Sequence, residues 1–185
     1  RQSGFEVRPV VDGPMHAQLV WSRHSIESVF LTAKVLGYWV RAFAGVCAPP
    51  DLDGVITQAL VHADSDEGLN THALDKLMAW QRKQPMQSEA GVELAANTDS
   101  HFQRTLNLAR ARFSAEGPAV LQRGKDRAAK VLGFIRSHIA QPKQNSFPTD
   151  VIKLIDRVDL NEISDPVAAI PQELLDLLDW MSEQP

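Results

Sequence analysis

The chain has 185 residues, of which 44% are hydrophobic and 23% are charged, a balance that excludes an intrinsically disordered protein. Its formal net charge of −4 gives no overall preference for nucleic acid or for acidic membranes. The single cysteine excludes an intramolecular disulfide, and together with the lack of a signal-peptide pattern it predicts a cytoplasmic or other reducing compartment.

The N-terminal residues show one short alternating pattern, which runs from Phe5 to Val10 and ends at Asp12-Gly13-Pro14. Alternation of apolar and polar side chains predicts a short edge strand or an extended N-terminal arm. After Pro14 we predict a helical lead-in from Met15 to Trp21.

The longest apolar pattern lies between Ser25 and Cys47, where apolar residues recur at three- and four-residue steps in two adjacent stripes. This pattern predicts a single helix that is buried on at least two sides, with the rest of the fold packed around it. Glu27, Lys34 and Arg41 interrupt the run and make membrane insertion costly, so we expect no membrane span. Gly45 and Pro49-Pro50 are expected to end the helix.

The rest of the sequence predicts an all-α fold, a compact bundle of about seven helices packed around residues 25–47. We expect the other helices at Leu52–Ala63, from Asn70 or Thr71 to just before Pro85, and at Thr98–Glu116, Val120–Ala140, Thr149–Val158 and Gln172–Glu183. Residues 82–98 are mostly polar or small and form the predicted linker, with a weak helix over Ala90–Ala96 as an alternative. We therefore expect one domain over residues 1–185, with a sub-boundary in this linker. Because the chain begins with Arg1, we expect it to be part of a longer protein.

A cluster of imidazoles and carboxylates follows the second helix and provides the weak metal-ligand candidates His62, Asp64, Asp66 and His72. Its spacing matches neither His-Glu-x-x-His nor a His-Asp dipeptide. As a calcium loop it would place Leu69 where glycine is required. We interpret the cluster as an acidic turn that ends one helix and supplies negative charge to the start of the next. We expect no metal, no cofactor and no catalytic residues.

Charge is strongly segregated in the second half of the chain. Residues 104–143 contain nine basic and two acidic residues, a net charge of +7, whereas residues 144–185 contain two basic and nine acidic residues, a net charge of −7. Arg123, Arg127 and Lys130 are predicted to project outward from one face of their helix and are candidate partner-binding residues. The acidic C-terminal helices could neutralise this face, or an acidic protein could bind it. Nucleic acid is the less favoured partner because aromatic residues are not interleaved with the basic ones.

The last predicted helix carries an L-x-x-L-L pattern, formed by Leu174, Leu177 and Leu178. A core helix and a helix that docks into a partner's groove both show this spacing, and we favour the core helix. Trp180 lies near the acidic flank of this helix and is a candidate contact anchor.

These observations predict a non-catalytic helical module of a larger protein that works by binding another protein. A nucleic-acid-binding module that uses the basic segment 104–143 is the alternative. A metal-dependent hydrolase that uses the turn from His62 to His72 is the second alternative. The oligomeric state and the identity of the partner stay open.

Overall fold

The computed structural model describes residues 5–9, 17–21, 26–83 and 98–182, with side-chain environments for residues 26–80 and 102–182. The predicted linker lies almost entirely outside the described residues, as does the alternative helix at 90–96. None of the described helices combines the length and the apolar character that crossing a membrane requires.

The N-terminal part of the chain forms an antiparallel hairpin of β1 (Phe5–Pro9) and β2 (Ala17–Trp21), in which Phe5 lies opposite Trp21 and Pro9 opposite Ala17. Of the two alternatives for the start of the chain, a short edge strand or an extended arm, the structure shows the strand, but the helical lead-in from Met15 to Trp21 is wrong. The seven residues from Met15 to Trp21 are too few for a helical period to be told from alternation. Pairing with β1 satisfies backbone groups of β2 that a helix would have satisfied internally.

The all-α prediction is confirmed for the rest of the described chain, which folds into ten helices, six of them with seven residues or more. The α-helices are α1 (Ile26–Phe30), α2 (Ala33–Ala44), α3 (Leu52–Asp64), α4 (Glu67–Lys83), α5 (Thr98–Glu116), α6 (Pro118–Leu121), α7 (Gly124–His138), α8 (Lys143–Ser146), α9 (Val151–Asp156) and α10 (Gln172–Ser182). Two single 3-10 turns, η1 (Gly45–Cys47) and η2 (Leu160–Glu162), complete the list.

The predicted single helix at 25–47 is divided into α1, α2 and η1, so this prediction is wrong in its continuity. Thr32 has an extended backbone (φ −116°, ψ 150°), and its hydroxyl accepts a hydrogen bond from the Val35 amide at 3.4 Å. Thr32 therefore caps a new helix, a role that the hydroxyl side chain of threonine favours. Gly45 adopts a positive φ of 54° at the end of α2, where glycine is less strained than other residues.

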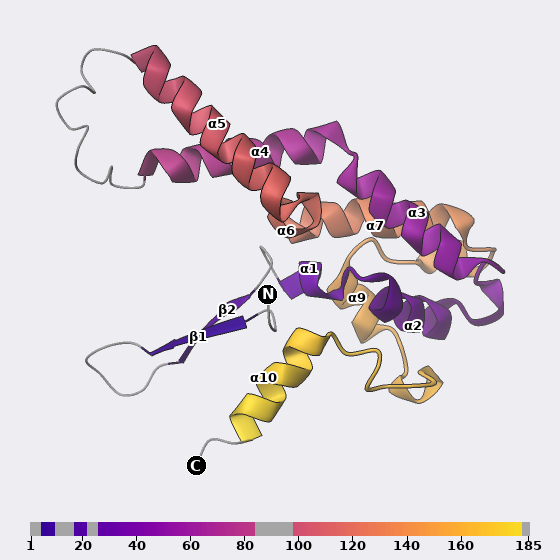
Figure 1. Cartoon of the computed structure of the whole chain (residues 1–185). Coiled ribbons are helices and arrows are strands. Elements are labelled where there is room, and N and C mark those ends of the chain that lie inside the picture. Colours follow the sequence, from indigo (N-terminus) through magenta and orange to yellow (C-terminus); the bar gives the residue numbers. More distant parts are fainter. Residues whose placement is uncertain (1–4, 10–16, 22–25, 84–97, 183–185) are drawn as a thin grey trace.

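The central position of this segment is confirmed. Leu36 and Val40 of α2 are buried in a core with side chains from α3, α7 and α9. The innermost residues of these three helices include Ile56, Leu132, Ile135 and Leu154, each at most 1% exposed. In Figure 1, α2, α3, α7 and α9 gather into one body at the right of the molecule.

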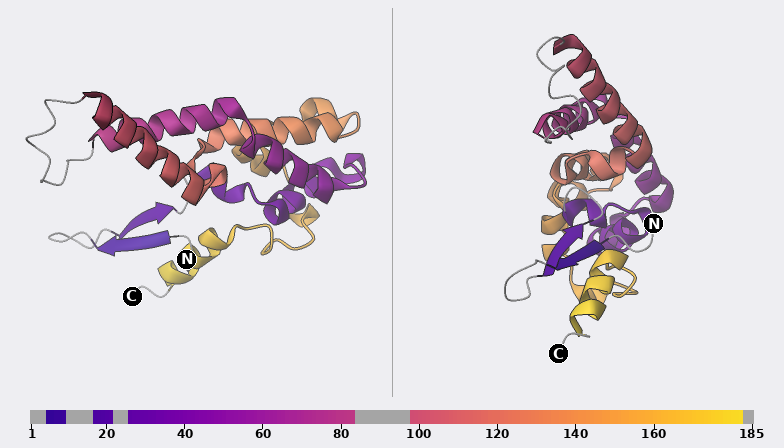
Figure 2. Two further views of the ribbon diagram at one scale, coloured as in Figure 1. Left: turned by 45° about the horizontal axis from the view of Figure 1, so that its top comes forward. Right: turned by 60° about the vertical axis from the view of Figure 1, so that its left-hand side comes forward.

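Helices α4 and α5 pack against each other as an arm that extends away from this body, as both figures show (Figures 1 and 2). Helix α4 begins at Glu67 and not at the predicted Asn70 or Thr71, because the Asp66 carboxylate accepts the Leu69 amide at 2.9 Å and caps the helix there. Helix α10 lies on the opposite side of α1 and α2 from the arm in all three views (Figures 1 and 2).

Candidate functional site

The acidic turn between α3 and α4 packs against α7. The carboxylate of Asp64 accepts hydrogen bonds from Nη2 and Nε of Arg127, at 2.7 and 3.1 Å. The Arg127 side chain is only 2% exposed, so the prediction that it points outward is wrong. Arg127 lies one turn before the buried Val131, and residues four apart share a helix face.

The other two basic candidates do not form a common face with Arg127. Lys130 contacts the Asp66 carboxylate at 2.7 Å. The hydrogen bond from Lys130, and next the one from the Leu69 backbone amide, lower the pKa of Asp66 below its ordinary value. Arg123 precedes the first turn of α7, where it lies 3.8 Å from Asp126 in an exposed pair. The predicted continuous helix at 120–140 is thus two helices, α6 and α7, with a break at Gln122 and Arg123.

Gln122 is a fully buried residue that sequence reasoning missed. Its amide donates hydrogen bonds to the backbone oxygen of Ala63 at 3.0 Å and to the side-chain oxygen of Asn70 at 2.7 Å. Asn70 in turn donates to the backbone oxygen of Asp64 at 2.9 Å. This polar network joins the end of α3, the start of α4 and the break between α6 and α7. These hydrogen bonds connect the base of the arm to the body.

Two buried atoms of this network, Oε1 of Gln122 and Nη1 of Arg127, have no hydrogen-bond partner in the described part of the chain. A buried polar atom without a partner costs free energy, so the network is incompletely satisfied. The apolar periodicity of the sequence does not indicate that either residue is buried, because both fall on the predicted polar side of a long helix.

The metal-ligand candidates are separated by this arrangement. The Asp64 carboxylate is paired with Arg127 and the Asp66 carboxylate with Lys130. The exposed His62 ring lies 5.5 Å from the Phe134 ring. His72 is exposed on α4. Among the residues that the structure describes, no group of three or more histidine, cysteine, aspartate or glutamate side chains is arranged to hold a metal ion. The geometry therefore gives the hydrolase alternative no support.

Helix α10 has no buried residue, so the favoured interpretation of it as a core helix is wrong. Leu174, near its start, packs against the core, and Trp180 is half-buried. Leu178 and Met181 lie three residues apart and are 55% and 56% exposed. The apolar stripe that the sequence predicts is present, but the second half of the helix presents it to solvent.

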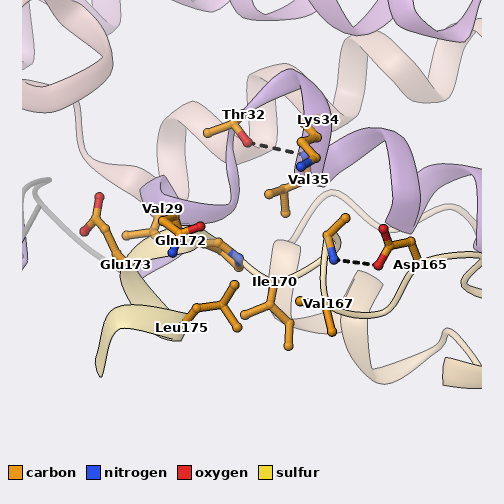
Figure 3. A pocket seen from close by; sticks show the side chains of 12 residues that line it. Val29, Thr32, Lys34, Val35, Asp165, Val167, Ile170, Gln172, Glu173 and Leu175 are labelled. Atoms are coloured by element: carbon orange, nitrogen blue, oxygen red, sulfur yellow. Dashed lines mark hydrogen bonds between the residues drawn. The ribbon is translucent and has the colours of Figure 1, made fainter. Parts of the chain in front are cut away.

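A cleft of about 480 Å³ lies where α10 meets the start of α2 (Figure 3). Val35, Ile170 and Leu175 give it apolar walls, and Val167 is 63% exposed. Two of its polar groups already cap local turns: Thr32 accepts from the Val35 amide and Asp165 accepts from the Ala168 amide at 3.0 Å. Leu175 lies three residues before Leu178, so the part of α10 that lines the cleft adjoins the exposed part of the helix.

We call the three side chains Leu175, Leu178 and Met181 the α10 face. Single exposed apolar residues such as Val46, Val61 and Leu160 also occur elsewhere, as on any protein surface. The α10 face differs from them because its members are neighbours on one helix and one of them, Leu175, lines a cleft with apolar walls. Grouped exposure of this kind is typical of an interaction site.

Comparisons with models of protein families, with curated proteins and with solved structures found no match to this chain. A proposal about function therefore rests on the surface chemistry of the described residues.

Proposed function

We propose that this chain is a non-catalytic helical module that binds another protein, and that the α10 face is its contact surface. The observation that carries the proposal is the exposure of Leu178 and Met181 on an amphipathic helix that buries none of its residues. Helices with an apolar stripe of this spacing dock into apolar grooves of partner proteins.

The charges beside the α10 face indicate the chemistry of the partner. Asp179 is exposed next to Leu178, and the described residues of α10 include three acids, Glu173, Asp176 and Asp179, but no base. A partner that buries Leu178 and Met181 in a groove would bring the rim of that groove close to Asp179. Electrostatic complementarity therefore favours a protein with an apolar groove and a basic side chain at its edge.

The nucleic-acid alternative has less support, because much of the basic segment is already paired. Arg112 binds Glu116 at 2.7 Å, Arg127 binds Asp64 and Lys130 binds Asp66. The affinity of a protein for nucleic-acid phosphates comes largely from basic side chains that displace the condensed counterions. Cations that already neutralise carboxylates within the fold contribute less to such binding.

Quantitative affinity capture tests the proposal with three forms of the tagged chain: the parent, Leu178→Glu/Met181→Glu, and the control Ile152→Glu/Leu160→Glu. The control adds the same charges at two apolar side chains that are 49% and 61% exposed on α9 and η2. We expect the α10 variant to lose specific proteins that the parent and the control both retain. Identical sets of proteins for the parent and the α10 variant would contradict the proposal.

A further inference from the structure

We propose that the partner of the α10 face is a second copy of this chain, which receives the helix in a groove between α4 and α5. This inference rests on the proposed function, because it assigns an occupant to the same helix face. The chain itself carries a surface with the chemistry that the α10 face requires: an apolar groove with a basic side chain at its rim.

The groove lies at the base of the arm and has a volume of about 310 Å³. Its lining residues are Asn70, Thr71 and Leu74 of α4 with Arg110, Phe113 and Ser114 of α5. Leu74 and Phe113 are half-buried and provide apolar surface, whereas Arg110 is exposed. An inserted Leu178 or Met181 would thus contact the apolar groups of the groove. The flanking Asp179 carboxylate would then reach the Arg110 guanidinium. Arginine is enriched at interfaces of this kind.

The charge balance of the chain supports a contact between these two surfaces. The basic segment makes four ion pairs within the described residues, and their acids are Glu116, Asp126, Asp64 and Asp66. The acidic C-terminal segment contributes to none of these four pairs. Arg110 and Asp179 remain exposed as complementary charges on the groove and on α10.

The arrangement of the fold places this contact between molecules. The arm lies on one side of α1 and α2, and α10 lies on the other side (Figures 1 and 2). The start of α10 is held there by the packing of Leu174, and the preceding segment is held by the hydrogen bond from the Trp39 indole to the Ala169 oxygen at 2.8 Å. Helix α10 therefore cannot reach the groove of its own chain while these contacts persist.

In this contact each molecule carries one donor helix and one receiving groove, which are different surfaces. This asymmetry permits a mixing experiment. The helix variant Leu178→Glu/Met181→Glu keeps an intact groove, and the groove variant Thr71→Glu/Arg110→Glu keeps an intact helix. All four replaced side chains are exposed, so we expect both variants to fold.

Sedimentation velocity of the parent from about 1 to about 200 µM, a range that covers weak protein complexes, should show reversible self-association. Each variant alone should remain a monomer. An equal mixture of the two should form a one-to-one heterodimer, because only one productive helix and groove pair is left. The control Arg104→Glu, an exposed arginine of α5 outside the groove, should self-associate like the parent.

A parent that stays monomeric over the whole concentration range would overturn the inference, and so would a mixture in which no heterodimer forms. Persistent self-association of the groove variant alone would also overturn it, because the α10 face would then bind elsewhere. These failures are distinct from failure of the proposed function. If the affinity capture still shows proteins lost only with the α10 variant, the face binds a different protein and the proposed function stands.

Discussion

Replacing Asp64 by alanine should destabilise the fold because it leaves the buried guanidinium of Arg127 without its carboxylate. The Arg127 side chain is 2% exposed, so its positive charge would stay buried without a partner. Removing one partner of a fully buried ion pair costs about 3–5 kcal/mol. Because Asp64 is 38% exposed, water screens the pair, and we expect about 2–3 kcal/mol.

Replacing Arg127, the other member of the pair, should have a much smaller effect on stability. Arg127→Met keeps most of the buried volume and removes the guanidinium, including the Nη1 atom that has no partner among the described residues. The released Asp64 carboxylate can be hydrated at the surface, so we expect a loss of less than about 1 kcal/mol. The double variant Asp64→Ala/Arg127→Met should be more stable than Asp64→Ala alone.

Urea unfolding followed by circular dichroism measures these differences, provided that the slopes of the transitions agree among the variants. A loss for Arg127→Met equal to that for Asp64→Ala would refute the reasoning. It would mean that the ion pair itself stabilises the fold, and that the cost does not come from the unpaired buried charge.

Three further predictions follow from the described contacts. Phe43 is 8% exposed, and its ring meets the Phe147 ring edge-on with 5.3 Å between the ring centroids. Phe43→Ala should therefore cost about 3–5 kcal/mol of unfolding free energy in the same assay. A loss below about 1 kcal/mol would contradict the core position of α2. Lys130→Met should raise the pKa of Asp66 in an NMR titration of its carboxyl carbon, because the hydrogen bond from Lys130 is the largest cause of the lowered pKa. The stability from this pair is fully present above the ordinary aspartate pKa of 3.8 and is lost as the pH falls through the lowered pKa, so parent and variant should converge in acid. Fluorescence anisotropy with single-stranded and duplex oligonucleotides should show no binding at physiological salt, whereas micromolar binding that weakens steeply with added salt would favour the nucleic-acid alternative.

Helices with long and uninterrupted periodicity could be predicted from the sequence. The predicted Leu52–Ala63 is observed as Leu52–Asp64, and the predicted Gln172–Glu183 as Gln172–Ser182. Asp150 caps α9 as expected, with its carboxylate 3.1 Å from the Lys153 amide. These elements depend mainly on local residues, which is why pattern and capping suffice for them.

The breaks at Thr32 and at Gln122-Arg123 could not be predicted, because the apolar period continues through both of them. The break at Thr32 depends on a local cap that competes with the continuing helical pattern, whereas the break at Gln122 depends on contacts that are distant in sequence. Gln122 leaves the helical path and donates hydrogen bonds to the end of α3 and the start of α4, more than fifty residues earlier. Periodicity records which residues prefer burial, but it does not record such long-range hydrogen bonds.

Most of the candidate site also required the structure. The sequence identified Arg127, Lys130, Asp64 and Asp66, but it assigned them to two unrelated sites, whereas the fold pairs them with each other. It identified the apolar stripe of α10, but a stripe alone does not distinguish a buried face from an exposed one. That distinction depends on how α10 sits against the body.

The unfolding free energy of Leu178→Glu/Met181→Glu is the most direct test that α10 presents its stripe to a partner and is not part of the core. The measurement should use dilute protein, because self-association would add stability to the parent. Both side chains are more than half exposed, so we expect a change within about 0.5 kcal/mol per substitution, the range for surface positions. A loss of about 3 kcal/mol or more, as for buried apolar side chains, would show that these residues are core residues and would contradict the proposed contact face.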